Sequence, residues 1–226
     1  MIPLRDENRA SSFPLVTVLI ILTCTAIFIY ESSLSRSGLE QFFEAFSLVP
    51  GQVSYELRSG EGSWRNVLPP FLTSMFLHGG WLHLIGNMWY LWIFGDNVED
   101  VLGPVRYLLF YFLCGIAAGV THVLVSPGSA VPTVGASGAI AGVLAGYASL
   151  FPRARVLTLI PLIFYFSVVE LPAVVLLVLW FVIQGLTGVL SLGAPGASGV
   201  AWGAHVGGFL AGLVLVRILK PRKVMA

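Results

Sequence analysis

Hydrophobic residues fall along this chain in six long stretches, each bounded by charged residues, proline or glycine. A helix that crosses a membrane needs about 20 mostly apolar residues, and most of these stretches approach that length. The first of them, Phe13 to Tyr30, has no small-residue cleavage site after it, which indicates a retained helix rather than a signal peptide. The pattern therefore predicts spans at residues 13–31, 79–95, 104–125, 137–151, 172–190 and 204–219.

The apolar run at residues 156–190 is too long for a single span. A helix of that length would measure about 52 Å, whereas the hydrocarbon core of a bilayer is about 30 Å thick. Pro161 and Pro172 interrupt the run, and Glu170 indicates an interface nearby. We therefore expect residues 156–170 to lie on or near the cytoplasmic surface and to lead into the fifth span.

Composition also indicates a membrane protein. Hydrophobic residues make up 57% of the 226 residues and charged residues only 10%, whereas a soluble domain has about a quarter charged residues. A core of this size cannot bury so much apolar surface, so part of it must face lipid. The net charge of +1, without a basic run, gives no indication of nucleic-acid binding. The two cysteines, Cys24 and Cys114, lie in apolar stretches, so we do not expect a disulfide framework.

Positive charges orient the predicted spans, because cytoplasmic loops are enriched in lysine and arginine. With the amino terminus inside, nine of the twelve Lys and Arg residues are cytoplasmic and the other three lie in the first outer loop. We predict an all-α membrane domain at residues 13–219, flanked by a cytoplasmic segment at 1–12 and a basic cytoplasmic tail at 220–226. The outer loop at 32–78 contains the stretch GLEQFFEAF, whose apolar residues share one helical face. This helix either lies in the membrane interface or packs on its own protein.

The fourth span is unusually short and begins at Ser137. Its 15 residues form about 22 Å of helix, and Arg153 and Arg155 fix its inner end at the cytoplasmic surface. Ser137 then lies about 8 Å below the outer edge of the bilayer core. The free N–H groups and partial positive charge of a helix N-terminus can stabilise an oxyanion there. The alternative is that Ser137 only caps the helix, with Gly135 and Gly138 easing the turn.

The sixth span supplies a histidine, His205, at a depth near that of Ser137. Small residues recur at intervals of four in both helices, and such stripes let membrane helices approach closely. The stripes consist of Gly138, Gly142 and Gly146 in the fourth span and Ala204, Gly208 and Gly212 in the sixth. Close packing would bring Ser137 and His205 together, so that the histidine could take the serine proton during attack and return it to a leaving amine. The alternative is a set of packing glycines beside an incidental histidine.

The second span carries His83 and Asn87 four residues apart, and therefore on one helical face. Two donors that face one way can bind the oxygen of a tetrahedral intermediate. They are also compatible with a hydrogen-bonded pair that joins two helices. His78 lies at the mouth of the predicted site, where we expect it to shape the cavity. No carboxylate is expected near His205, so the predicted site is a serine–histidine dyad.

The chain carries three motifs in order on the second, fourth and sixth predicted spans: HGGWLHLIGN at 78–87, GASG at 135–138 and AHVGGFLAG at 204–212. Together they resemble the motifs of the rhomboid intramembrane serine proteases. Trp64 and Arg65 resemble a pair in the first outer loop of that family, and Glu99 resembles the polar end of its second span. The resemblance covers roughly residues 60–215.

The resemblance implies a six-helix rhomboid-like bundle with Ser137 as nucleophile and His205 as general base. His83, Asn87 and the backbone N–H of Ser137 would form the oxyanion hole, and the motif glycines would support them. The supporting glycines are Gly135, Gly138, Gly208 and Gly212. The resemblance further implies membrane-protein substrates with a helix-weakened transmembrane segment, a site on the non-cytoplasmic side, no metal ion and no cofactor. We expect the chain in a bacterial cell (inner) membrane.

One position departs from the family pattern. Some members carry an aromatic residue four positions after the serine, and this residue packs on the catalytic histidine. Here the position is Ala141, so the sequence leaves open which side chain holds His205. The fifth span, near Trp180 and Phe181, is a candidate gate for substrates.

Two other functions are compatible with parts of the sequence. The first is a catalytically silent rhomboid-like protein that binds or escorts client transmembrane segments, and the intact serine and histidine argue against it. The second is a transporter or a metal-binding membrane protein. The sequence shows no obvious inverted repeat of the kind found in many transporters, and a zinc site needs three or four ligands around one centre.

Overall fold

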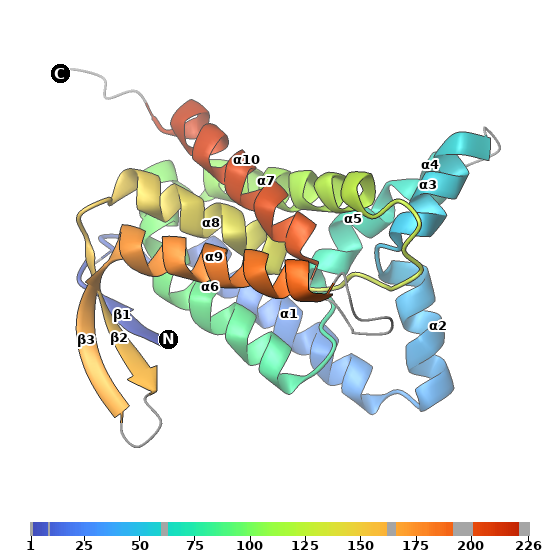
Figure 1. Ribbon diagram of the computed structural model, residues 1–226, viewed down its shortest axis with the longest axis horizontal. Helices are drawn as coiled ribbons and strands as arrows, with labels where there is room; N and C mark the ends of the chain where they lie inside the picture. Colours follow the sequence, from blue (N-terminus) through green and yellow to red (C-terminus); the bar gives the residue numbers. More distant parts are fainter. Residues whose placement is uncertain (1, 9, 60–62, 162–165, 192–200, 222–226) are drawn as a thin grey trace.

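A computed structural model gives the fold of the chain, and all residues are described except 1, 9, 60–62, 162–165, 192–200 and 222–226 (Figure 1). The described part is mostly helical. Its six long helices are α1 (Leu15–Ser33), α6 (Trp81–Leu102), α7 (Pro104–Val125), α8 (Ser137–Leu150), α9 (Ala173–Ser191) and α10 (Trp202–Leu219). Each coincides in sequence with one predicted span to within a few residues, apart from the carboxyl-terminal end of α6.

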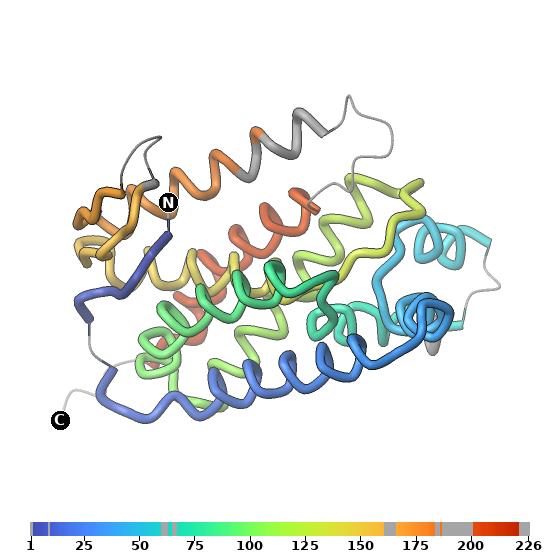
Figure 2. The backbone as a smooth tube through the Cα atoms, turned by 90° about the horizontal axis from the view of Figure 1, so that it is seen from below, coloured from blue at the N-terminus to red at the C-terminus, as the bar shows by residue number. Residues whose placement is uncertain are grey.

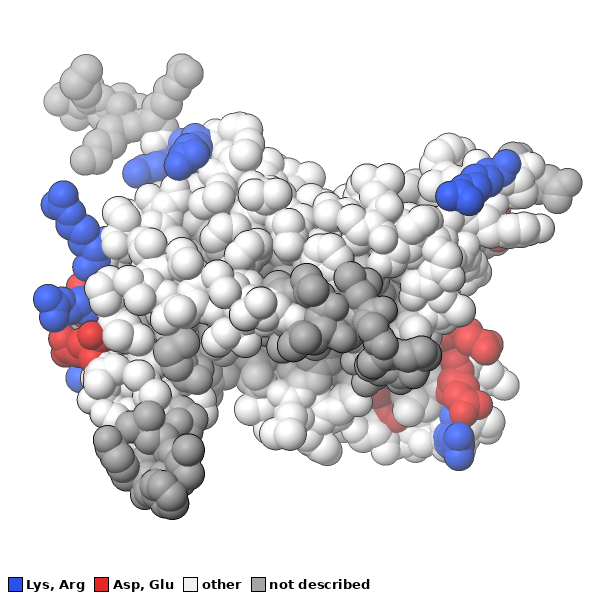
Figure 3. All heavy atoms as spheres, in the orientation of Figure 1, with Lys and Arg blue, Asp and Glu red and all other residues white. Residues whose placement is uncertain are grey.

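Three of these helices, α1, α7 and α10, are long and apolar enough to cross a membrane. The charged side chains of the face drawn in Figure 3 gather at the two ends of the molecule, with a broad uncharged surface between them. A band of this kind suits the hydrocarbon core of a bilayer, where charged groups are costly. The chain is an integral membrane protein.

Helix α8 occupies the centre of the bundle. Every residue from Gly138 to Tyr147 is buried, and α6, α7 and α10 surround the helix (Figure 1). The glycines explain why α10 lies so close to α8. A Cβ atom on Gly208 would collide with the carbonyl oxygen of Gly138, and one on Gly142 would lie 3.0 Å from the carbonyl oxygen of Gly208. The predicted close packing of the two small-residue stripes is therefore confirmed.

Helix α6 extends to Leu102, several residues beyond the predicted span, because its acidic residues have partners. Helix α1 begins after Pro14, which has no side-chain group to cap it. Glu99 takes that role, since its carboxylate accepts hydrogen bonds from the N–H groups of Val16 and Thr17, at 2.8 Å each. The Thr17 hydroxyl donates a third bond of 2.8 Å, and Glu99 is only 2% exposed. Glu99 thus joins α6 to the start of α1.

Replacing Glu99 by alanine is expected to lower the free energy of unfolding by about 2 kcal/mol, because two buried backbone donors lose their charged acceptor. The midpoint of thermal unfolding of the purified protein in detergent measures the effect. Glu40→Ala is the control, since it removes a carboxylate whose partner among the described residues is the exposed Arg36. Equal unfolding temperatures for the Glu99 and Glu40 variants would contradict this role for Glu99.

A three-stranded antiparallel sheet closes one end of the bundle (Figure 1). Its strands, in the order β1-β2-β3, are β1 (Ile2–Asp6), β2 (Arg155–Pro161) and β3 (Phe166–Pro172). The prediction of an all-α fold is wrong here, because residues 155–161 and 166–172 pair as antiparallel strands and part of segment 1–12 adds a third strand. Both β2 and β3 are rich in β-branched residues, and Pro161 and Pro172 stand at strand ends, where no ladder hydrogen bond is lost.

Strand β1 is also fixed to the helices. The carboxylate of Asp6 accepts hydrogen bonds from the Tyr147 hydroxyl (2.6 Å) and the Asn97 side chain (3.0 Å). Burial raises the pKa of Asp6 above its ordinary value. The indole of Trp89 donates to the carbonyl of Pro3 at 2.6 Å. These contacts attach the start of the chain to α6 and α8.

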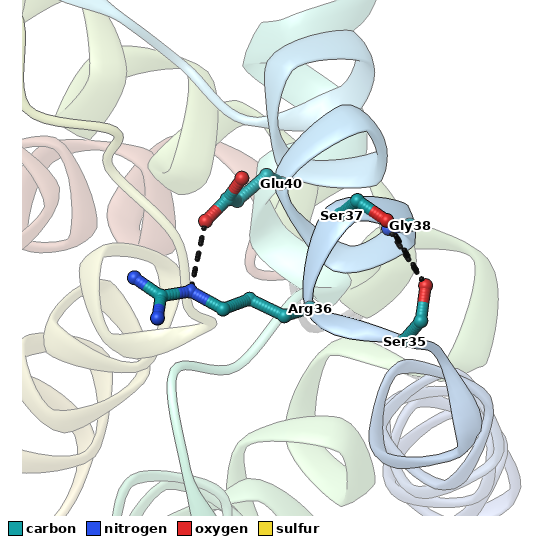
Figure 4. Close-up of polar contacts among 5 residues, drawn as sticks. All are labelled: Ser35, Arg36, Ser37, Gly38 and Glu40. Atoms are coloured by element: carbon teal, nitrogen blue, oxygen red, sulfur yellow. Dashed lines mark hydrogen bonds and ion pairs between the residues drawn. The ribbon is translucent and has the colours of Figure 1, made fainter.

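The long outer loop forms short helices at the other end of the molecule (Figure 1). They are α2 (Arg36–Phe46), α3 (Pro50–Ser59), α4 (Trp64–Val67), α5 (Pro69–Thr73) and the 3₁₀ helix η1 (Ser74–Phe76). Helix α2 confirms the helix expected for GLEQFFEAF. Figure 4 shows its start, where the Ser35 hydroxyl accepts from the N–H of Gly38 (3.2 Å) and Arg36 pairs with Glu40 (3.3 Å). The Phe42 ring of α2 packs on Tyr30 of α1, so part of the apolar face of α2 packs against its own protein.

Candidate active site

Ser137 is the first residue of α8 and does not cap it. The N-cap is Ala136, and no side chain caps the helix. The preceding loop is fixed by backbone hydrogen bonds, from the N–H of Gly135 to the carbonyl of Ser74 (2.8 Å) and between Leu48 and Thr133 (2.8 and 3.1 Å). The alternative of Ser137 as a cap is therefore wrong, and its hydroxyl is available for another partner.

That partner is His205 in the first turn of α10. The distance between Nε2 of His205 and Oγ of Ser137 is 2.8 Å, and His205 is only 5% exposed. Close contact between α8 and α10 brings the two side chains together, as the glycine stripes predicted. The structure thus places a serine hydroxyl against a buried imidazole, the arrangement in which a histidine can activate a serine nucleophile.

The other ring nitrogen of His205 has no polar partner. Its Nδ1 atom is buried and makes no hydrogen bond within the part of the chain that the structure describes. A triad would place a carboxylate there to orient the ring. No group of three or more His, Cys, Asp or Glu side chains able to hold a metal ion occurs among the described residues. The site is therefore a pair, and packing has to orient the histidine.

His83 and Asn87 of α6 lie against Gly135, which precedes Ser137 by two residues. Gly135 has φ +118°, and a Cβ atom there would lie 2.7 Å from Cε1 and Nε2 of His83 and 3.5 Å from Nδ2 of Asn87. Nδ2 of Asn87 is buried and has no hydrogen-bond partner among the described residues. Nδ1 of His83 accepts from the N–H of Gly79 at 3.4 Å, so the neutral ring carries its proton on Nε2. Both side chains thus place an N–H donor beside the loop that leads to Ser137.

These groups share a cavity of about 710 Å³. Its lining includes Ser137, His205, His83, Asn87, Trp180 and Trp202. The backbone N–H of Ser137 belongs to the first turn of α8, where N–H groups have no partner within the helix. The cavity therefore combines a hydroxyl hydrogen-bonded to a histidine with three donors for a developing negative charge.

The remaining predicted site residues lie at different distances from this cavity. His78 is 1% exposed and its ring packs on that of His83, with centroids 5.2 Å apart. Burial lowers the pKa of His78 to about 4, so this ring is neutral at pH 7. His78 contacts His83 but is not among the residues that line the cavity, so it does not shape the cavity directly as expected. Trp64 is 66% exposed and does not line the cavity, and the side chain of Arg65 lies outside the described part. Glu99 acts far from the site, at the start of α1.

Replacing Gly135 by alanine is expected to slow the reaction of Ser137 with a serine-reactive probe at least about tenfold. The new Cβ atom would force an unfavourable backbone conformation and push the His83 ring away. Gly128→Ala is the matched control, because Gly128 lies in the same loop with open space around it. Rates of probe reaction for the two variants, compared with wild type, test the prediction. Similar rates for both would contradict it.

The fold and the site define an integral membrane protein with a serine–histidine pair that lines a cavity. The Rhomboid domain family matches residues 61–222, and the chain belongs to this family. It is 43% identical over 75 residues to Rhomboid-like protein 11, chloroplastic, of Arabidopsis thaliana. The matched residues are 33% of this chain and 26% of that protein. It is 33% identical over 100 residues to the mitochondrial presenilin-associated rhomboid-like protein of Mus musculus, covering 43% and 26%.

A longer match is to RHOMBOID-like protein 5 of Arabidopsis thaliana, with 31% identity over 153 residues, which are 67% of this chain and 44% of that protein. The chain thus matches less than half the length of these relatives. Two of the names specify a chloroplast or a mitochondrion, so they do not support the expected bacterial cell membrane.

Proposed function

We propose that the protein is an intramembrane serine endopeptidase that cleaves transmembrane segments with Ser137 and His205. The observation that carries the proposal is the 2.8 Å hydrogen bond between Oγ of Ser137 and Nε2 of His205, inside a cavity that also holds free donors. Membership of the rhomboid family supports this assignment.

The chemistry follows from the positions of these atoms. His205 Nε2 takes the Ser137 proton while Oγ attacks the scissile carbonyl. The oxyanion that forms is stabilised by the Ser137 N–H, Nδ2 of Asn87 and Nε2 of His83. The imidazolium then protonates the leaving amine, which gives an acyl-enzyme and frees one product. A water molecule, deprotonated by His205, hydrolyses the ester and regenerates Ser137.

We place the six long helices across the bilayer, with both termini cytoplasmic and the cavity open to the opposite side. The charged ends of the molecule support this placement (Figure 3). The 14 residues of α8 form about 21 Å of helix, shorter than the core of a bilayer, so Ser137 would lie below the membrane surface. A peptide bond must leave its helix to reach Oγ, so we infer substrates whose transmembrane segments are weakened by helix-breaking residues.

The test is covalent labelling of the purified protein, in detergent or liposomes, with a fluorophosphonate probe. Wild type is expected to be labelled at Ser137, as mapped by peptide mass spectrometry, and folded Ser137→Ala is expected to remain unlabelled. An active rhomboid protease labelled in parallel serves as the positive control. Folded wild type that stays unlabelled while the control reacts would overturn the proposal in favour of a silent protein that binds or escorts client transmembrane segments.

A further inference from the structure

The hydrogen bonds of His205 do not by themselves fix its ring. Nε2 contacts Ser137, but Nδ1 has no partner among the described residues, so the ring can rotate about the Ser137 contact. Ala141, the position four residues after the serine, is fully buried and carries no ring. Packing from another element has to orient the imidazole.

The ring that packs on His205 belongs to Trp180 of α9. The two ring centroids are 5.5 Å apart with an angle of 45° between the planes. Trp180 also packs on Tyr90 of α6, with centroids 6.3 Å apart, and it lines the cavity of the serine. The indole therefore lies between the histidine and a second helix that carries the proposed oxyanion donors.

We propose that Trp180 is the positioning residue that keeps the His205 imidazole directed at Ser137. The inference rests on the proposed protease activity, and it assigns to α9 the part that an aromatic residue of the fourth span plays in some relatives. A catalytic group held 1 Å from its productive position can lose about 100-fold in rate, so the packing of one ring is sufficient to matter.

Among the described residues, α9 is the least closely packed of the helices around the site. Its contact with α10 is much smaller than the contacts that α10 makes with α7 and α8. Figure 2 shows α9 along one edge of the bundle, and one of its faces exposes apolar side chains. Exposed members of this face include Val175, Val178, Val182 and Ile183. Displacement of α9 would remove Trp180 from His205, so the same helix would control both access to the cavity and the alignment of the base.

Substitutions at Trp180 separate positioning from simple obstruction. Trp180→Phe keeps a ring, and Trp180→Leu fills space without one. Trp180→Ala and Trp180→Leu are expected to slow fluorophosphonate labelling and lower kcat by about 10- to 100-fold with little change in KM, whereas Trp180→Phe stays within about threefold of wild type. The small probe needs no displaced helix, so its reaction rate reports the alignment of Ser137 and His205.

A second measurement does not depend on activity. Ring ¹⁵N resonances of His205, assigned through its Gln variant, are expected to show a fixed ring in wild type and Trp180→Phe and an averaged ring in Trp180→Ala. Phe181→Ala is the matched variant, because Phe181 packs on Phe209 of α10 with centroids 4.8 Å apart. It is expected to leave the His205 resonances unchanged.

The outcomes distinguish the two proposals. Wild-type labelling rates and unchanged His205 resonances in Trp180→Ala would overturn the positioning role and leave the protease assignment intact. Faster cleavage by Trp180→Ala with unchanged labelling would also overturn the positioning role. It would show that Trp180 only obstructs the entry of substrates. Folded wild type that is not labelled, but whose His205 ring is released in Trp180→Ala, would support positioning and overturn the protease.

Discussion

Replacing His205 by alanine is expected to lower kcat for cleavage of a transmembrane substrate by about 10⁴- to 10⁶-fold, to the level of the Ser137→Ala variant. In the proposed mechanism, His205 accepts the serine proton and donates it to the leaving amine, and within the described part of the chain no carboxylate pairs with its ring. Cleavage of a fluorogenic transmembrane peptide that the wild type processes gives the rates.

Because the two residues act as a unit, the double variant Ser137→Ala/His205→Ala is expected to be no slower than either single variant. Thermal unfolding in detergent checks that all three variants are folded. A His205→Ala protein that keeps a tenth of the wild-type kcat would show that another group takes the serine proton, and the dyad would then be wrong.

The second large effect is expected at Gly208, where α10 meets α8. Alanine at this position is expected to lower the free energy of unfolding by about 3 kcal/mol, the upper end of the usual cost of overpacking. The cost is high because the added Cβ atom meets the carbonyl oxygen of Gly138, and a backbone group cannot rotate away as a side chain can. Cleavage should fall about 100-fold as well, since His205 lies one turn before Gly208 and would move away from Ser137.

Thermal unfolding of Gly208→Ala against Gly86→Ala measures the stability effect. Gly86 is also a helical glycine, on α6, but no atom lies within 4 Å of a Cβ built there. Gly86→Ala therefore gains the higher helix propensity of alanine but introduces no collision. If Gly208→Ala unfolds at the same temperature as Gly86→Ala, the two helices can separate freely and close packing does not hold the site together.

The sequence was sufficient to predict the long helices and the meeting of Ser137 with His205. Apolar runs of about 20 residues locate the long helices, because such runs are typical of membrane-spanning helices. The stripes at Gly138 and Gly208 predicted the contact because small residues at a spacing of four allow close approach only along one helical face. Local patterns of this kind predict which helical faces come into contact.

Contacts between distant segments that no local pattern marks could not be predicted. A short apolar run such as residues 155–161 is compatible with strand or helix, and the strand that completes its sheet lies about 150 residues earlier in the chain. From the sequence, Glu99 is only a polar residue near the end of a helix. Its role as acceptor for the N–H groups of Val16 and Thr17 depends on the packing of α1 against α6. Trp180 lies in an apolar stretch, where an aromatic residue gives no sign that its ring faces a histidine.

The pairing of β1 with β2 has a consequence for biogenesis. Residues 2–6 are synthesised before their partner strand at 155–161, which is made only after α1, α6, α7 and α8. The sheet can therefore be completed only after most of the long helices have been synthesised. The family match begins at residue 61, so a fragment limited to it would lack β1 and leave β2 as an open edge with unpaired backbone groups. An open edge of this kind can pair with a second molecule, and in the intact sheet β1 covers it.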